Sequence, residues 1–258
     1  MKPLKTGKVL LDDSSFNLCV TLTSGTIKEL KDDLAFLGGK EFSLIEWRAD
    51  YFFFTDRLFD TVSACISLIK EAFPSKPLLF TYRRMEEGGQ TSIEENDLIT
   101  LRKEMIEQSR AEIIDLEMFW FREDQNEENL NEYRNLMKQA KKRGTKVLLS
   151  WHDFKETPDE DTLLSILRTQ EKMGADLAKI ATYAKTELDA DRLMNVSCKA
   201  SQVLQIPHIA ISMGNLGKRS RYDWKNSRSC ITFAPVHNPS APGQLSLLEL
   251  QSRLSKAH

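Results

Sequence analysis

The chain has 258 residues, of which 41% are hydrophobic and 29% are charged, and its formal net charge is -2. This length is typical of one large α/β domain, and the near-neutral charge argues against binding to nucleic acid or to an anionic membrane. The first residues, Met1 to Lys5, precede no apolar run, so we expect neither a signal peptide nor a membrane span.

Short apolar runs rich in β-branched and aromatic residues recur along the chain, a pattern typical of parallel strands that are buried on both faces. We predict eight strands, at residues 17–23, 44–50, 77–83, 112–119, 146–152, 177–183, 208–213 and 230–236. Longer amphipathic segments predict helices at residues 26–37, 58–73, 94–108, 129–142, 161–173, 187–200 and 245–257. Ser92 and Thr157 are predicted to cap two of these helices.

Strands that alternate with helices form either a closed barrel or an open doubly wound sheet. No glycine-rich phosphate loop follows the first predicted strand, which disfavours the nucleotide-binding open sheet. We therefore predict the α/β class and a single (β/α)8 TIM barrel over residues 1–258. Residues 1–16 precede the first strand and are expected to form a short N-terminal extension over the bottom of the barrel.

The four cysteines, Cys19, Cys65, Cys198 and Cys230, lie far apart and show no C-x-x-C spacing. This spacing is not that of a zinc site, so we expect no metal. Free buried thiols of a cytosolic protein are the simplest interpretation.

Polar residues interrupt the apolar strands close to their ends, and in a barrel the active site lies at the C-terminal ends of the strands. The residues in question are Glu46, Arg48, Arg83, His152 and Lys179. Lys179 stands out because it lies inside the apolar run Leu177 to Ala181. Burial favours a neutral amine, which is a nucleophile for carbonyl groups. A structural lysine at a strand edge, or one paired with Glu46 or another interior carboxylate, is an equally good interpretation of the pattern.

His152 at the end of its strand fits a general base, although a hydrogen-bonded core or loop histidine fits as well. Arg48, Arg83 and Arg221 are predicted to point toward one end of the barrel, where they would bind a carboxylate or phosphate. The alternative is that they pair with Glu46, Glu87 or Glu117 inside the barrel. The small-residue segment 240–244 after the last strand is either a loop that covers a ligand or a simple turn.

Several short motifs, taken together and in order, resemble the type I 3-dehydroquinate dehydratase family, whose members form a Schiff base with their substrate. The resemblance extends over about residues 17–257. The matching motifs are Glu46-Trp47-Arg48-Ala49-Asp50, Phe80-Thr81-Tyr82-Arg83 followed by Glu87-Gly88-Gly89, His152-Asp153-Phe154, Ala178-Lys179-Ile180-Ala181, Ser212-Met213-Gly214 with Ser220-Arg221, and Ser240-Ala241-Pro242-Gly243-Gln244.

The resemblance implies a lyase that dehydrates 3-dehydroquinate to 3-dehydroshikimate, the third step of the shikimate pathway toward chorismate and the aromatic amino acids. It implies that Lys179 forms the imine, that His152 is the general acid and base, and that Glu87 orients His152. The spacing from Arg83 favours Glu87 over Glu86 for that role. The substrate-binding residues that it implies are Thr21, Glu46, Arg48, Arg83, Met213, Arg221, Ser240 and Gln244.

The resemblance further implies a cytoplasmic homodimer that needs no cofactor. Thr182-Tyr183-Ala184 and Trp151 depart from the usual family pattern beside the catalytic positions, so we expect them to reshape the pocket wall. Two other functions fit the same residues: a Schiff-base aldolase acting on another keto compound, and an inactive barrel that binds a small carboxylate.

Overall fold

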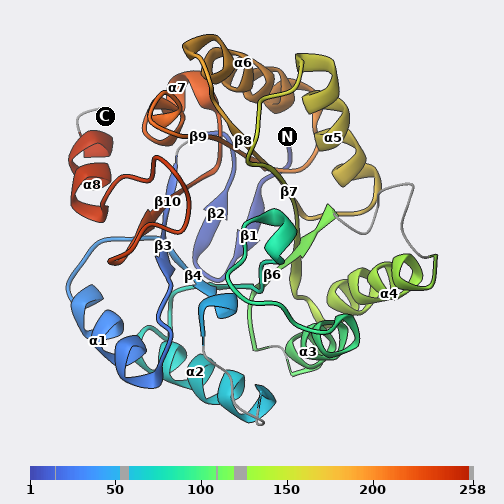
Figure 1. Cartoon of the computed structure of the whole chain (residues 1–258), viewed down its shortest axis with the longest axis vertical. Helices are drawn as coiled ribbons and strands as arrows, with labels where there is room; N and C mark the ends of the chain where they lie inside the picture. The colour runs from blue at the N-terminus through green and yellow to red at the C-terminus, as the bar shows by residue number, and fades with distance from the viewer. Residues whose placement is uncertain (15, 53–57, 109, 119–126, 256–258) are drawn as a thin grey trace.

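The computed structural model describes residues 1–14, 16–52, 58–108, 110–118 and 127–255. Eight parallel strands, joined in the order β10-β3-β4-β5-β6-β7-β8-β9, form the barrel seen in Figure 1. They confirm the eight predicted strands, except that residue 119 lies outside the described part of the chain. The strands are β3 (Asn17–Leu22), β4 (Leu44–Arg48), β5 (Leu78–Thr81), β6 (Ile113–Glu117), β7 (Lys146–Asp153), β8 (Leu177–Tyr183), β9 (His208–Met213) and β10 (Ile231–Pro235).

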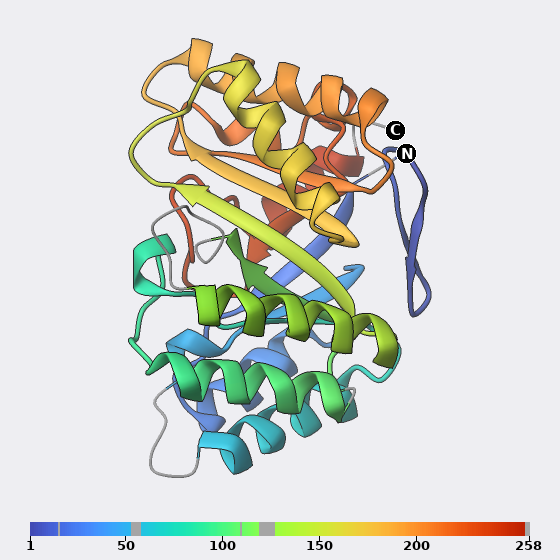
Figure 2. The ribbon, with the colours of Figure 1, turned by 90° about the vertical axis from the view of Figure 1, so that its right-hand side faces the viewer.

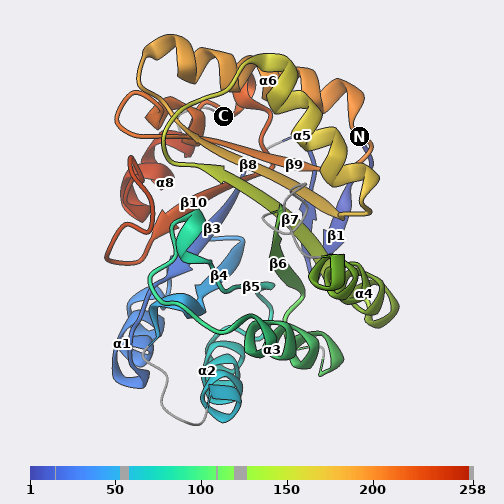
Figure 3. The ribbon, with the colours of Figure 1, turned by 45° about the vertical axis from the view of Figure 1, so that its right-hand side comes forward.

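Helices surround the barrel, and Figure 3 shows α5 and α6 side by side over β8 and β9. The predicted helices are confirmed, with residues 256–257 of the last one outside the described chain. The observed helices are α1 (Ile27–Leu37), α2 (Leu58–Ala72), α3 (Glu95–Glu107), α4 (Glu127–Arg143), α5 (Glu160–Lys172), α6 (Glu187–Val203), the short α7 (Trp224–Ser227) and α8 (Leu247–Ser255).

The two predicted helix caps are wrong. Helix α3 begins after Glu94 without a side-chain cap, two residues beyond Ser92. Asp159 caps α5 by accepting a hydrogen bond from the backbone N–H of Thr162. The Thr157 hydroxyl instead donates toward β8, at 2.9 Å from the backbone oxygen of Tyr183, so it ties the β7–α5 loop to the neighbouring strand.

Alternation along the strands divides the buried residues into two cores. One set points outward and packs between the sheet and the helices, as Val20, Ile45 and Phe80 do. The other set points into the barrel and forms a smaller apolar cluster near the first residues of the strands, which includes Leu44 and Leu79. Polar side chains occupy the inward positions further along the strands, and this order places the site at the C-terminal end.

Residues 1–14 contribute an element that the sequence pattern did not predict, a two-stranded antiparallel hairpin of β1 (Leu4–Thr6) and β2 (Val9–Leu11). Figure 2 shows it at the end of the barrel opposite the arrowhead of β7. Its Leu11 side chain is fully buried and belongs to the inward cluster. The hairpin therefore covers the N-terminal ends of the strands with apolar side chains.

Strands β9 and β10 close the ring without a regular ladder, since the sheet order ends with one of them at each side. The backbone N–H of Cys230 still donates to the oxygen of His208 at 3.0 Å. Two serine hydroxyls accept hydrogen bonds from β9 amides further along: Ser229 from Ala210 and Ser220 from Ser212. The segment between the strands thus inserts its own side chains where ladder bonds are missing, and it carries Arg221.

No helix in the described ranges combines the length and the apolar character that a membrane crossing requires.

Candidate active site

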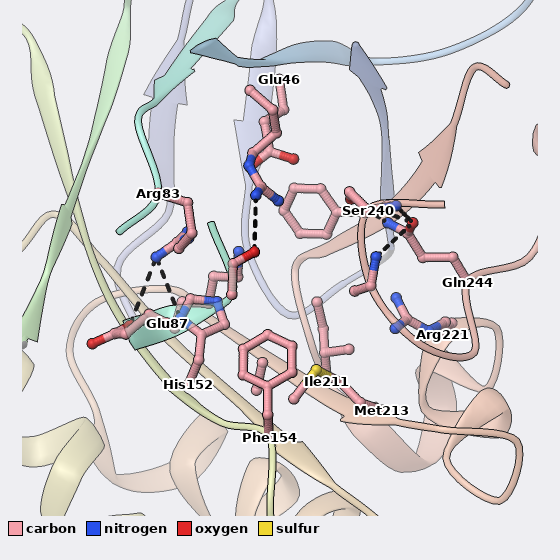
Figure 4. Close-up of a pocket in the computed structure, with 16 residues that line it drawn as sticks. Glu46, Arg83, Glu87, His152, Phe154, Ile211, Met213, Arg221, Ser240 and Gln244 are labelled. Atoms are coloured by element: carbon pink, nitrogen blue, oxygen red, sulfur yellow. Dashed lines mark hydrogen bonds and ion pairs between the residues drawn. The ribbon is translucent and has the colours of Figure 1, made fainter. Parts of the chain in front are cut away.

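A cavity opens at the C-terminal end of the barrel, and most predicted site residues line it (Figure 4). Ten of the eleven do so: Glu46, Arg48, Arg83, Glu87, His152, Lys179, Met213, Arg221, Ser240 and Gln244. The lining is completed by the backbone of Gly88 and by the apolar side chains of Phe154, Ala181, Ile211, Phe233 and Ala241.

These side chains come together because they lie at every second residue along parallel strands. Glu46 and Arg48 are two residues apart on β4, and Lys179 and Ala181 are two apart on β8. Residues with this spacing share the inward face of a strand. The register aligns Lys179 of β8 with Ser150 of β7, two residues before His152. The amine of Lys179 and the imidazole of His152 therefore lie at successive inward positions of two neighbouring strands.

Lys179 is 6% exposed and lies at the base of this cavity. Burial lowers the pKa of its ammonium group; the charge of Glu46 opposes this effect and that of Arg83 adds to it. The Glu46 carboxylate accepts hydrogen bonds from the hydroxyls of Thr21 and Thr81, at 3.0 Å and 3.1 Å. No ion pair of Lys179 is found among the described residues, so the alternative of a structural lysine paired with Glu46 is not what the geometry displays.

The backbone of Lys179 is held by α5 rather than left to the sheet alone. The buried Gln170 side chain donates to the Lys179 oxygen at 2.9 Å and accepts from its N–H at 3.0 Å. Two hydrogen bonds to one residue fix the direction in which its side chain leaves the strand.

His152 forms the second reactive feature, since its Nδ1 lies 2.8 Å from Glu87 Oε2. Burial lowers the pKa of the imidazole well below 6.5, and the charges of Arg83 and Lys179 lower it further. The free protein therefore holds a neutral imidazole that donates from Nδ1 to Glu87 and leaves Nε2 as an acceptor. Phe154 stacks beside the imidazole, with ring centroids 6.2 Å apart.

Glu87 reaches this position because it ends a short 3-10 helix, η2 (Met85–Glu87), in the loop that follows β5. Gly88 follows with φ 85°, in the left-handed region, and a Cβ there would collide with the Phe154 ring. Only glycine satisfies both conditions. Glu87 is buried while Glu86 is exposed, so the geometry agrees with Glu87 as the partner of the imidazole.

Two of the three arginines that were predicted to converge are already paired with carboxylates. Arg48 makes two hydrogen bonds to Asp50, at 2.7 Å and 2.8 Å. Arg83 pairs with Asp115 at 2.5 Å and with Glu117 at 3.3 Å. These two guanidinium groups line the cavity with most of their charge balanced inside the barrel.

Arg221 differs from both. It follows β9 at the end of the 3-10 helix η4 (Lys218–Arg221) and is 2% exposed. Its guanidinium donates to the backbone oxygen of Pro242 at 3.2 Å, its Nε has no partner, and no carboxylate of the described chain lies within ion-pair distance. Burial without an anion lowers its pKa to about 10. A buried cation of this kind is suited to a carboxylate or phosphate ligand.

The segment from Ser240 to Gln244 lies beside Arg221 at the cavity (Figure 4). The Gln244 side chain accepts from the backbone N–H of Ser240 at 2.6 Å, which closes the segment into a compact loop. Gly243 has φ 76°, and a Cβ there would overlap the backbone of Gly214. The loop can therefore dock closely on the end of β9 and present polar groups to the cavity.

Some predicted positions lie elsewhere than expected. Thr21 is fully buried beneath the cavity and does not line it; it contacts Glu46 instead. Trp151 packs with the outer cluster between β8 and the helices, and Tyr183 packs against Gly214. Neither side chain lines the cavity, although Tyr183 packs against the inward cluster to which the lining residues Ala181 and Met213 belong.

Sequence reasoning missed the apolar lining residues, among them Phe154, Ile211 and Phe233. An apolar residue in an apolar strand does not differ from its neighbours, so the sequence pattern does not single it out. Counting inward positions would have found Ile211 and Phe233, since each lies two residues after an inward isoleucine, Ile209 or Ile231. In the described chain, no group of three His, Cys, Asp or Glu residues is placed to hold a metal ion.

Comparison with known proteins agrees with these motifs. Residues 18–258 match the model of a family described as Type I 3-dehydroquinase. The chain is 32% identical to the 3-dehydroquinate dehydratase of Alkaliphilus oremlandii, over 100% of this chain and 98% of the relative. It is also 32% identical to that of Clostridium novyi, over 100% and 99%.

Among solved structures, the chain is similar to a type I 3-dehydroquinate dehydratase from Clostridium difficile that carries covalently modified comenic acid, with a TM-score of 0.90 and 29% identity over 100% of this chain and 98% of that one. The Geobacillus kaustophilus enzyme gives a TM-score of 0.88 and 27% identity, over 99% and 96%. The chain therefore belongs to the type I 3-dehydroquinase family.

Proposed function

We propose that this enzyme dehydrates 3-dehydroquinate to 3-dehydroshikimate through an imine on Lys179, with His152 as general acid and base. The observation that carries the proposal is one cavity holding both a buried amine of lowered pKa and an imidazole bonded to a carboxylate. A neutral amine and a positioned base are the two groups that this reaction requires.

The reaction begins when the neutral Lys179 amine adds to the ketone carbon. His152 Nε2 takes a proton from the nitrogen of the adduct and passes it to the oxygen, and a second proton, taken up from solvent, lets that oxygen depart as water and leaves a protonated imine. His152 then removes a proton from the carbon next to the imine, and the bond electrons move into an enamine. The enamine expels the hydroxyl of the following carbon, which takes the proton back from His152 and leaves as water. Hydrolysis of the remaining imine releases the product and restores the amine.

We assign the polar groups of the cavity to different parts of the substrate. Arg221 is the partner we assign to the substrate carboxylate, because it is buried and lacks an anion. Gln244 and Ser240 lie beside it and would bind the same end of the substrate. Glu46, Arg48 and Arg83 would contact the hydroxyls, with Met213 packing against the ring. Thr21 would act through its hydrogen bond to Glu46 rather than by touching the substrate.

Two observations support covalent chemistry. The Lys179 side chain reaches into the cavity without an ion-pair partner in the described chain, so its amine is available to a ligand. The Clostridium difficile relative, similar over the whole chain, is described with covalently modified comenic acid.

Borohydride reduction tests the proposal. With 3-dehydroquinate or its product present, reduction should leave a stable adduct whose mass is located on the Lys179 peptide. Lys179→Met should abolish the adduct. Lys185→Met, a control at a lysine whose side chain is 58% exposed, should not change it. A folded protein that dehydrates the substrate without any adduct on Lys179 would refute the imine mechanism.

A further inference from the structure

The Phe233 side chain lies directly against the amine of Lys179. Nζ sits over the face of the Phe233 ring, 4.8 Å from its centroid. Phe233 is 3% exposed and comes from β10, where it follows the inward Ile231 by two residues. Its ring therefore forms part of the cavity floor next to the reacting atom.

Charged groups reach this amine from several neighbouring strands, and their effects oppose one another. The carboxylates of Glu46 and Asp115 favour the charged form of Lys179, while the guanidinium groups of Arg83 and Arg48 disfavour it. The groups that influence Lys179 or are influenced by its charge are Cys19 on β3, Glu46 and Arg48 on β4, Arg83 after β5, Asp115 on β6 and His152 on β7.

None of these groups makes a hydrogen bond or ion pair with Nζ in the described part of the chain, whereas the face of the Phe233 ring lies next to it. The face of an aromatic ring carries partial negative charge and attracts a cation that lies over it. Its hydrogens point sideways, and it has no lone pair to compete for the amine proton.

We propose that the face of Phe233 stabilises positive charge at Lys179 Nζ and so keeps the imine nitrogen protonated during catalysis. The inference rests on the proposed function, because the imine nitrogen is the same atom as Nζ and keeps its place over the ring. Only a protonated imine withdraws electrons strongly enough to release the neighbouring proton. Two arginines disfavour positive charge at this nitrogen, and the ring face adds to the opposing effect of Glu46 and Asp115.

The size of the contact suits this role. A cation over an aromatic ring changes an acid dissociation constant by about 2-fold to 30-fold, depending on how far the pair is removed from water. A contact of this size favours the cation without removing the neutral amine that must first attack the ketone. A carboxylate at contact distance would hold the ammonium form more firmly and suppress that attack.

Stepwise fluorination of Phe233 tests the inference, because fluorine weakens the negative ring face and hardly changes the shape of the ring. Phe233 would be replaced by 4-fluoro-, 3,5-difluoro- and 3,4,5-trifluorophenylalanine in the full chain. The pKa of Lys179 in the free protein would be measured from the pH dependence of its acylation by acetic anhydride, followed by mass spectrometry of the Lys179 peptide.

We expect the Lys179 pKa to fall steadily with each fluorine, by about 0.4 to 1.5 units for the trifluoro ring. The alkaline limb of the pH profile of kcat should move to lower pH in the same order. The matched control is the same series at Phe80, a fully buried ring of β5 that packs against Trp47 outside the cavity. Neither quantity should change in that series.

A Lys179 pKa and an alkaline limb that stay constant along the Phe233 series, or that move equally in the Phe80 series, would overturn the inference. If one fluorinated protein fails to fold, the remaining members still define the trend. Borohydride trapping separates this failure from a failure of the proposed function. An adduct on Lys179 without a fluorine trend rejects only the role of Phe233, whereas no adduct in the unsubstituted protein rejects the imine itself.

Discussion

At the scale of single residues, the arginines of the cavity differ in charge balance. Two are paired with carboxylates of the protein, and the third is placed to bind an anionic ligand. Arg48 and Arg83 each have a carboxylate of the protein within hydrogen-bond distance. Arg221 is equally buried but has none in the described chain. Burying an unpaired guanidinium lowers the stability of the folded protein, and an anionic ligand would offset that loss.

The surroundings of His152 keep its imidazole in the form that can act as a base. Its depressed pKa keeps the imidazole neutral in the free protein, and the bond to Glu87 orients Nε2 away from the carboxylate. The proton taken from the substrate then makes it a cation that the Glu87 carboxylate attracts but that the charges of Arg83 and Arg48 repel. That repulsion favours return of the proton to the departing hydroxyl.

Replacing His152 with alanine should separate imine formation from the proton transfers. We expect His152→Ala to lose about 10²–10⁴-fold in kcat, the usual contribution of a positioned acid and base. The Lys179 amine should still react slowly, since burial lowers its pKa without help from the imidazole. Steady-state turnover and borohydride trapping on the same preparation measure both effects. Turnover at the unsubstituted rate would show that another group carries the protons.

The polar half of the site could be predicted at this scale, and the apolar half could not. Lys179 and His152 contrast with the apolar strands that hold them. Phe233 has no such contrast, and only the three-dimensional register places its ring at Lys179. The structural alternative for the arginines, pairing with Glu46, Glu87 or Glu117, holds for Arg83, which pairs with Glu117. Arg48 pairs with Asp50 instead, and Arg221 has no carboxylate partner in the described chain.

At the scale of elements, short apolar runs were sufficient to predict every strand of the barrel, and longer amphipathic segments predicted its main helices. Strands β1 and β2 have three residues each, too few for an alternating pattern to be recognised. The connection from β9 to β10 was left without a helix because α7 has only four residues. That connection positions Arg221, whose backbone oxygen accepts a hydrogen bond from Thr232 of β10 at 2.7 Å.

A buried histidine at the contact between α6 and β9 leads us to expect that the folded protein loses stability in acid. His208 of β9 is fully buried; its Nε2 lies 2.7 Å from the Ser197 hydroxyl of α6, and burial lowers its pKa from 6.5 to about 4. Below pH 6.5 the unfolded chain therefore binds a proton at His208, whereas the folded protein does not bind it until the pH falls to about 4. Stability should fall across this window, by about 3 kcal/mol in total from this group.

Urea unfolding at several pH values from 7 to 4 would measure this loss. His208→Gln retains a side-chain amide near Ser197 but has no ionisable group, so its free energy of unfolding should decline less steeply than that of the unsubstituted protein. The difference between the two curves isolates His208 from the carboxylates, which titrate in both. Parallel curves would mean that His208 does not contribute to acid sensitivity.

At the scale of the whole molecule, the barrel separates the residues that react from those that hold the N-terminal end together. Inward side chains are apolar near the first residues of the strands, whereas toward the other end charged and polar side chains join apolar ones such as Ile211 and Phe233 around the cavity. The β1–β2 hairpin covers the apolar end, far along the strands from the cavity (Figure 2). Barrels of this kind generally keep stability at one end and chemistry at the other.

The hairpin offers a direct test of that separation, because two adjacent leucines have opposite environments. Leu11 is fully buried in the inward cluster, whereas Leu10 is 51% exposed. Leu11→Ala should lower the free energy of unfolding by about 2–5 kcal/mol, the usual effect of emptying a leucine site in a core. Leu10→Ala should change it by less than about 0.5 kcal/mol. Both variants should keep the borohydride adduct and the turnover of the unsubstituted protein at temperatures where they are folded. Loss of turnover in folded Leu11→Ala would instead couple the hairpin to the site, through the inward side chains that connect the two ends of the barrel.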